Sequence, residues 1–436
     1  MRFYQELQLN QSGSKELIRQ SKTTKEKLYH IAVYLFKIAI TVAFCFLFVT
    51  LFSILFGSEN SIAGVVVLLC IMVFRQAHFE IHAGQSTVLL VLFFINMTLC
   101  SHLANKLSPV AGMLINIVAL AILVFLGCHN PSMFNQSTLV LGYLLLYGYD
   151  VSGKSYLMRI AGMAVGAVLT CIVFYRNHKH RTYDKHVKHI LQEFDLSSTR
   201  TKWQLCQIIC VPVVICIAEL CDMPRAMWAG IAAMSVILPL MDDMQYRVRK
   251  RIIGNIAGVI CFTVLYFLLP SPIYAFIGVI GGIGVGFSTQ YSWQAVFNTF
   301  GALAIATQLY GLKGAVSLRI IQNVFGVVFA LLFCIIFHWF VSKIKVKEET
   351  GLTMKNPRLV GVKQFWAESG RYIVFLFSAT KFTGDLRSSN EGEVEWFTKE
   401  EMKNINLVNY FFEHLAVFEG DYSEYIYESE DSIKIY

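Results

Sequence analysis

The chain has 436 residues, of which 56% are hydrophobic and only 15% are charged. Soluble globular domains average about 45–50% apolar and about 25% charged residues, so this composition excludes an ordinary soluble enzyme. The net charge of +8 is uneven, because residues 346–436 contain 10 Lys or Arg against 16 Asp or Glu. We assign the basic excess of the preceding residues to membrane-flanking segments near lipid headgroups, and we expect no nucleic-acid partner.

Apolar residues are gathered in twelve stretches that we expect to cross ~30 Å of hydrocarbon as helices. The first stretch follows a polar, basic segment at residues 1–30 and is too long for the core of a signal peptide. The fifth is also compatible with a re-entrant segment. The twelve stretches are 31–57, 62–75, 86–105, 109–127, 136–149, 157–175, 204–221, 226–241, 252–270, 273–288, 292–310 and 318–341.

The distribution of basic residues predicts the orientation of these spans. With the N-terminus inside, the inner segments hold 21 Lys or Arg, whereas the outer ends hold six. A bias of this size predicts that both termini and the linker at 176–203 are cytoplasmic. The linker separates a first transmembrane repeat at 31–175 from a second at 204–342, and we expect a multi-pass protein of the cytoplasmic membrane.

Two similar elements end the two blocks of spans. Arg159-Ile160 is followed by Gly166, and Arg319-Ile320 is followed by Gly326, at an offset of 160 residues; Ala-Gly pairs that begin at 63 and 229 correspond at 166. The third such element begins at Arg251. The pattern predicts an all-α polytopic fold with two parallel repeats of about six helices, although chance similarity in so biased a composition is an alternative.

The arginines of these elements are the first candidates for substrate binding. A guanidinium binds a carboxylate in bidentate fashion, and a charge beside a span is costly unless it has a role. Arg159 and Arg319 lie near predicted outer ends, against the charge bias, so anion binding and a local structural role both stay open. For Arg251, within a basic cluster at the inner end of its span, headgroup contact is the favoured alternative.

Two further ionisable residues lie within spans. Lys37 is two turns into the first span and is able to reach the inner interface, but it is also a substrate-binding candidate. Glu219 near the outer end of its span is a candidate proton-coupling carboxylate, with an ion pair to Arg225 as the alternative.

Two other patterns have mainly structural interpretations. In the linker, residues 183, 187, 190, 191 and 194 form an apolar stripe that packs either on the inner leaflet or on the spans. Its four histidines lie among cations, which opposes metal binding. Gly278, Gly282 and Gly286 form a small-residue face that favours close helix packing.

The sequence up to about residue 343 resembles the fusaric acid resistance and aromatic acid exporter superfamily (FUSC-like proteins). The resemblance rests on Gln245-Tyr-Arg-Val-Arg-Lys-Arg251-Ile-Ile-Gly-Asn-Ile-Ala-Gly258, and on Phe297-Asn298-Thr-Phe-Gly301 with the following Arg319 element. It implies efflux of weak aromatic or other organic acids, and it transfers no defined binding residue.

The C-terminal segment has a different resemblance. Val346-Lys-Glu348-Glu349-Thr-Gly351-Leu352 is similar to the end of a Nudix box, whose carboxylates bind Mg²⁺, and this implies Glu348 and Glu349 as vestigial metal ligands. Ile344-Lys345 replaces the Arg-Glu of the box, and its upstream half would fall inside the last span. We therefore expect residues 343–436 to be a truncated, inactive half Nudix fold of α/β type, produced by a gene fusion or by a sequence-joining error.

Within this segment we expect strands at 371–377 and 391–397, and Thr398 with Glu401 predicts a capping box before a helix. For the whole chain, the leading hypothesis is a secondary exporter of small organic acids, aromatic ones included, without enzymatic activity or cofactor. The alternatives are a membrane-tethered Nudix-type nucleoside diphosphate hydrolase and a non-transporting scaffold. The expected partners are the lipid bilayer and a small organic anion, and a homo-oligomer is compatible with the sequence.

Overall fold

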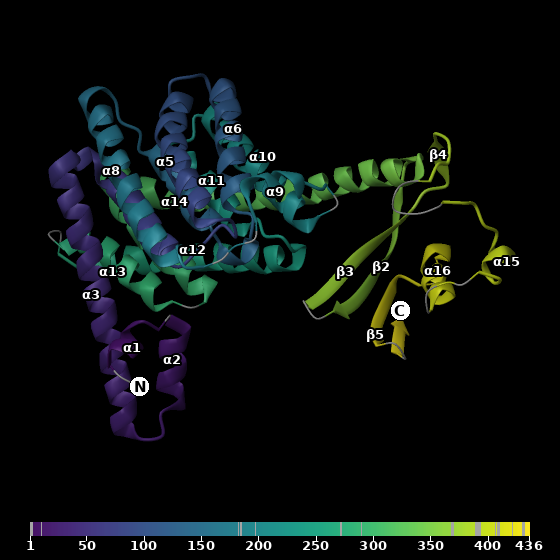
Figure 1. The fold of residues 1–436 in the computed structure, drawn as a ribbon, viewed down its shortest axis with the longest axis horizontal. Helices are drawn as coiled ribbons and strands as arrows, with labels where there is room; N and C mark the ends of the chain where they lie inside the picture. The colour runs from purple at the N-terminus through teal and green to yellow at the C-terminus, as the bar shows by residue number, and fades with distance from the viewer. Residues whose placement is uncertain are drawn as a thin grey trace. The chain divides into compact units, whose positions relative to one another are not determined.

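The computed structural model describes the whole chain except residues 1, 2, 10, 182, 184, 197, 271, 272, 289, 368, 369, 389–393, 406, 408, 409, 421, 430 and 431. The chain divides into two compact units, Met1–Ile335 and Ile336–Tyr436. The first unit is a helical bundle, and the second contains small β-sheets (Figure 1).

The first block of the bundle is built around α5, which contacts α6, α7 and α8, while α4 lies against α3, α7 and α8. α3 is long and mostly exposed, as expected for a helix that faces lipid. The helices of this part are α1 (Phe3–Leu7), α2 (Gln11–Gln20), α3 (Thr24–Phe56), α4 (Ser61–Phe74), α5 (Ala83–Asn105), α6 (Pro109–Gly127), α7 (Gln136–Gly148) and α8 (Gly153–His178).

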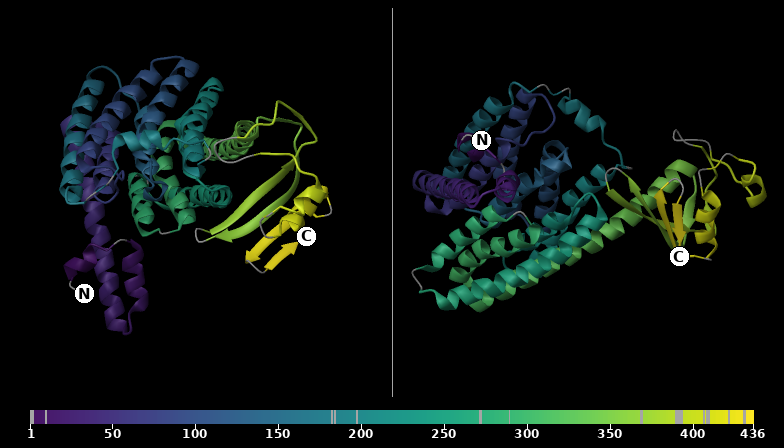
Figure 2. Two further views of the ribbon diagram at one scale, coloured as in Figure 1. Left: turned by 45° about the vertical axis from the view of Figure 1, so that its right-hand side comes forward. Right: turned by 90° about the horizontal axis from the view of Figure 1, so that it is seen from below.

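Among the described residues, α10 packs on α6 and α11 on α7, which joins the second block to the first. α13 also packs on α3 (Figures 1 and 2). Its last helix is interrupted at Gly311, whose backbone (φ 67°, ψ 171°) is not helical and is accessible to glycine without strain. The helices after the first block are α9 (Val187–Gln192), α10 (Thr199–Leu220), α11 (Met227–Val236), α12 (Met241–Leu268), α13 (Tyr274–Phe287) and α14 (Tyr291–Thr350).

All twelve stretches predicted as spans contain a helix. Within the part of the chain that the structure describes, seven helices are long and apolar enough to cross a membrane. The others include α4, α7, α11 and α13, which have 14, 13, 10 and 14 residues. At 1.5 Å per residue these are shorter than the hydrocarbon layer, and α4, α7 and α11 are instead buried among longer helices.

The predicted span at 226–241 is wrong in its second half. α11 ends at Val236, Ile237 is extended (φ −70°, ψ 108°), and Pro239 follows. Proline removes a helical hydrogen bond and disfavours a helical conformation at the residue before it, which accounts for the break. The carbonyl freed at Ile237 accepts hydrogen bonds from the side chains of Trp203 (3.1 Å) and Gln207 (3.0 Å). Buried non-helical backbone is therefore satisfied by neighbouring side chains.

The glycines of the three Arg-Ile-x5-Gly elements all lie at close helix contacts. A Cβ at Gly166 would lie 2.4 Å from a Val67 methyl, and one at Gly326 would lie 2.2 Å from the Ala229 carbonyl oxygen. Gly258 has a similar contact with α14. The predicted close packing of the α13 glycines is confirmed at Gly281 and Gly284, which contact α14, but it is wrong at Gly282, where a Cβ meets nothing within 4 Å.

The linker packs on the helices of the first block, as one of the two interpretations of its apolar stripe predicts. α9 contacts α6, the His82 amide donates to the Lys185 carbonyl (3.1 Å), and the Val187 amide donates to the Gln85 side chain (3.0 Å). Ile190 of the predicted stripe is buried; the side chain at position 191 lies outside the described residues.

An ionic cluster completes this docking of the linker. Glu193 accepts from Lys185 (2.7 Å) and Arg200 (3.1 Å), and it lies 3.1 Å from the buried His129 ring. The hydrogen bond from Lys185 lowers the pKa of Glu193, and burial together with Arg200 lowers the pKa of His129. Among the described residues, no group of three or more His, Cys, Asp or Glu is arranged to bind a metal ion.

The C-terminal unit contains a four-stranded sheet in the order β3-β2-β5-β6, in which β2 pairs antiparallel with β3 and parallel with β5. The strand predicted at 371–377 is confirmed as part of β3. The described residues 394–397 of the other predicted strand are not a strand. The elements are β1 (Thr353–Lys355), β2 (Arg358–Ala367), β3 (Gly370–Ser378), β4 (Lys381–Thr383), α15 (Lys399–Met402), α16 (Phe411–Glu419), β5 (Glu424–Ser429) and β6 (Ser432–Ile435).

The predicted capping box at Thr398 is present. The Thr398 hydroxyl accepts from the Glu401 amide, and the Glu401 carboxylate accepts from the Thr398 amide (2.7 Å). The hydrogen bonds from Thr398 also lower the pKa of Glu401. The box opens the short α15, whereas α16 packs on the sheet through Val417.

Candidate functional site

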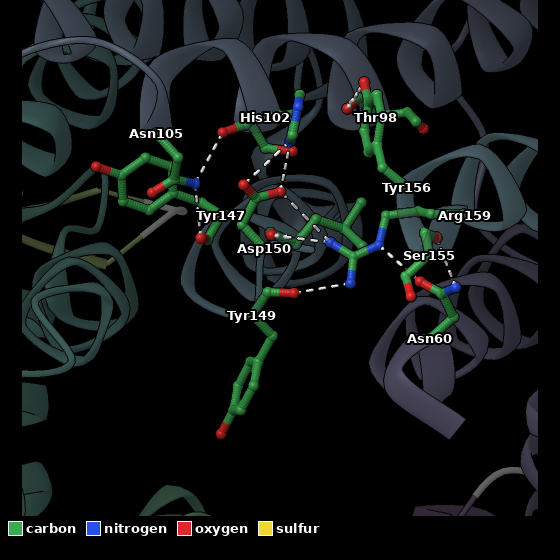
Figure 3. A network of polar contacts seen from close by, with 12 residues as sticks. Asn60, Thr98, His102, Asn105, Tyr147, Tyr149, Asp150, Ser155, Tyr156 and Arg159 are labelled. Carbon is green, nitrogen blue, oxygen red and sulfur yellow. Dashed lines mark hydrogen bonds and ion pairs between the residues drawn. The ribbon is translucent and has the colours of Figure 1, made fainter. Parts of the chain in front are cut away.

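Arg159 is completely buried and its guanidinium is surrounded by acceptors (Figure 3). Nε donates to the Asn60 side-chain oxygen (3.0 Å), and Nη2 donates to the Tyr149 carbonyl (2.7 Å). Nη1 reaches the Leu146 carbonyl at 3.5 Å and lies 3.9 Å from the Asp150 carboxylate. These partners come from the N-cap of α4, from the last turn of α7 and from the turn between α7 and α8.

Asp150 connects this cation to a histidine. The His102 ring nitrogen Nδ1 lies 2.8 and 3.0 Å from the two Asp150 oxygens, and the ring stacks on Tyr156 with centroids 3.7 Å apart (Figure 3). The charge of Arg159 is therefore balanced by Asp150, and its donors have protein acceptors. This arrangement favours the structural interpretation of Arg159 over anion binding.

Arg319 occupies the corresponding position on α14 but has different surroundings. It is 5% exposed, and its guanidinium carbon lies 5.1 Å from the centroid of the Trp228 ring. Among the described residues, no carboxylate lies within ion-pair distance of Arg319 and its buried Nε has no hydrogen-bond partner. A buried charge without a counter-charge from the protein is costly.

Arg251 lies close enough to Arg319 to interact with its charge, and it is buried in the bundle. α12 begins at Met241, so Arg251 is in its third turn and is only 7% exposed. Its Nε donates to the Asn323 side-chain oxygen (3.0 Å), and Nη1 donates to the Tyr291 hydroxyl (3.2 Å). This burial and these protein partners argue against headgroup contact, the alternative that the sequence favours for Arg251.

The two arginines repel one another, and further polar atoms around them lack partners. The Arg251 guanidinium and the Tyr149 hydroxyl lie near enough to Arg319 to interact with its charge. In the described part of the chain, the buried Asn323 amide nitrogen and Gln322 side-chain oxygen also have no hydrogen-bond partner. The cluster of Arg251, Arg319 and Asn323, which we call the α14 arginine site, presents unused donors and excess positive charge to a potential anion.

Residues 213–333 match the family model described as fusaric acid resistance protein-like. We call residues 213–333, which resemble this family, the FUSC-like segment. The match covers the second block from α10 to α14 and includes Arg251 and Arg319. No curated protein matches the chain in sequence. Together with the seven membrane-length helices, the FUSC-like segment identifies a multi-pass membrane protein. The matched residues end before the C-terminal unit begins.

The other sequence candidates have partners outside the α14 arginine site. The Lys37 ammonium donates to the Leu9 carbonyl and to the Ser14 hydroxyl (3.1 Å), so it holds the N-terminal segment against α3. Glu219 accepts a hydrogen bond from the Tyr147 hydroxyl. The side chains of Glu348 and Glu349, the candidate metal ligands, lie outside the described residues.

The sequence does not predict several residues in and around the α14 arginine site. The sequence predicts Arg225 only as an ion-pair partner of Glu219. In the structure, its guanidinium carbon lies 4.6 Å from the Tyr149 ring centroid. Trp228 and Asn323 were not considered, because each is an ordinary residue of an apolar helix. One signal was available, since Asp150 precedes Arg159 by nine residues and Tyr310 holds the equivalent place before Arg319.

Proposed function

We propose that the protein exports small organic acid anions across the cytoplasmic membrane and binds them at the α14 arginine site. The observation that carries this proposal is the buried Arg319 guanidinium, which has no anionic partner among the described residues. The FUSC-like segment supports it, because the description of the matching family concerns resistance to an organic acid.

A carboxylate fits the chemistry of this site. It supplies the negative charge that two neighbouring guanidiniums lack, and its two oxygens match the paired donors of an arginine. The unused Asn323 amide nitrogen adds a third donor. The Trp228 ring beside Arg319 offers an apolar wall for the body of such an acid.

We also propose that the two blocks are parallel repeats with both termini and the linker in the cytoplasm. Two contacts support the duplication: Gly166 of α8 packs on α4, and Gly326 of α14 packs on α11 at the Ala229 carbonyl. Positions 63 and 229 correspond at the predicted offset. Short α4 and α11 would then be equivalent inner helices, like the discontinuous helices that line transport sites.

The membrane potential contributes to driving this export. Moving one elementary charge through 100 mV is worth about 2.3 kcal/mol, and an inside-negative potential favours the exit of an anion. A proton gradient adds to this drive only if a proton moves inward for each anion that leaves.

Flux in proteoliposomes tests the proposal. Vesicles containing the purified protein, loaded with labelled benzoate and held at an inside-negative potential, should lose label faster than protein-free vesicles. Arg319→Gln should abolish most of this flux, because the amide removes the charge. Lys313→Gln is the matched control, since Lys313 is an exposed cation of the same helix, and it should retain the flux.

Two results would contradict the proposal. One is equal loss of label from vesicles with and without the protein across several carboxylates, which would favour a non-transporting scaffold. The other is wild-type flux in folded Arg319→Gln protein, which would place the anion elsewhere.

A further inference from the structure

The turn between α10 and α11, residues 221–226, has an unusual backbone. Asp222 (φ 52°) and Arg225 (φ 61°) are both in the left-handed region, which non-glycine residues rarely adopt. Two such residues in one six-residue turn indicate a conformation held by its contacts, and strain of this kind is common in segments that move.

Side chains from the first block supply those contacts. The Tyr147 hydroxyl at the end of α7 donates to the Glu219 carboxylate at the end of α10. The Arg225 guanidinium stacks on the Tyr149 ring, and its Nη1 donates to the Gly148 carbonyl (3.2 Å). Two bridges therefore connect the last residues of α7 to the turn of the second block.

The same turn is connected to the α14 arginine site. Trp228, whose ring lies beside Arg319, follows Arg225 by three residues at the start of α11. The Gln322 amide nitrogen donates to the Pro224 carbonyl (3.1 Å), which ties the turn to α14 one helical turn from Arg319. A displacement of the turn would therefore move the aromatic wall of the site.

We propose that residues 221–226 form a lid over the α14 arginine site, which the Tyr147–Glu219 and Tyr149–Arg225 contacts hold shut and protonation of Glu219 releases. The proposal rests on the proposed function. A hydrogen bond to a carboxylate is about twice as strong as one between neutral groups, so protonation weakens the first contact. A proton from the predicted outer side would then favour the state that releases the anion outward.

The surroundings of Glu219 leave few other groups to titrate there. Tyr147 faces it from α7, Cys216 lies on its own helix, and Asp222 and Arg225 lie in the turn. The neighbouring helices α6 and α11 contain no Asp, Glu, Lys, Arg or His. Of the two carboxyl groups here, Glu219 is the one that accepts the hydrogen bond from Tyr147, so we assign the control of the lid to Glu219.

The pH profile of benzoate efflux tests this assignment. Glu219→Gln keeps an acceptor for the Tyr147 hydroxyl but is unable to titrate, so the acceleration by external acid should disappear while benzoate binding persists. Asp222→Asn is the matched control, because asparagine also tolerates a left-handed backbone, and it should keep the wild-type profile. An unchanged profile in Glu219→Gln would overturn the lid and leave export intact.

Thiol labelling tests the lid without any flux. Cys216 is 5% exposed and Cys221 is exposed on the same segment. A small membrane-impermeant thiol reagent, read by site-resolved mass spectrometry, should label Cys216 several-fold faster relative to Cys221 in Tyr147→Phe and in Tyr149→Leu. An unchanged ratio in both variants would overturn the lid, whereas absence of flux in the wild type would refute only export.

Discussion

Arg159 and Arg319 lie in similar Arg-Ile-x5-Gly elements of the sequence, yet their environments are opposite. Both are more than nine-tenths buried, and both are followed after seven residues by a glycine at a close helix contact. Arg159 has Asn60, two carbonyl groups and Asp150 around it. Arg319 has the Trp228 ring and a repelling arginine. Similar helix packing therefore tolerates either a neutralised cation, which stabilises the fold, or an unneutralised one, which is available to a ligand.

The two arginines should differ most in their contribution to stability, and the absence of this difference would contradict their opposite environments. Arg159→Met should lower the free energy of unfolding by about 3–5 kcal/mol, because it leaves Asp150 without its guanidinium and removes donors from buried acceptors. Arg319→Met should leave stability unchanged or raise it, since it removes an unpaired buried charge. Thermal unfolding of the detergent-solubilised variants measures the difference, and equal losses would show that Arg319 is also structurally paired.

Substitution of the glycines that follow the two arginines should have a smaller effect on stability, and it tests the helix contacts at these glycines. Gly326→Ala places a methyl group 2.2 Å from a backbone oxygen, whereas Gly166→Ala meets the Val67 side chain, which is able to shift. Both should destabilise by about 1–3 kcal/mol, with Gly326→Ala at the upper end. Gly282→Ala, which meets nothing within 4 Å, is the control and should cost nothing. The reverse ranking in thermal unfolding would contradict the contact at Ala229.

The sequence predicted the positions of the helices well, because apolar length is a local property. It also located Arg159 and Arg319. It did not separate their roles, since Asn60 is 99 residues from Arg159 and only the fold brings the two together. The end of α11 had a local signal in Pro239, but the hydrogen bond from Trp203 that satisfies the Ile237 carbonyl comes from another helix. Asp150 was the one local signal that distinguished the two arginines.

The pH dependence of linker docking should be a smaller effect. The linker packs on the first block next to His129. Burial and Arg200 lower the pKa of His129 in the docked state. A histidine with a lowered pKa stabilises docking above its usual value of about 6.5, and this stabilisation decreases as the pH falls below it. The lowered pKa of Glu193 acts only at more acidic pH, near and below about 4.3.

Hydrogen exchange of residues 185–196 measures this docking. Protection, corrected for intrinsic rates, should fall a few-fold between pH 7.5 and 5.5 in the wild type. His129→Gln, which does not titrate, should show a smaller change, and Lys188→Gln is a control on the same short helix. Equal protection of the wild type at both pH values would mean that contacts other than His129, such as buried Ile190 and the Val187 hydrogen bond, hold the linker. Either outcome should leave the α14 arginine site unaffected, because the linker contacts lie on the block whose arginine is already neutralised.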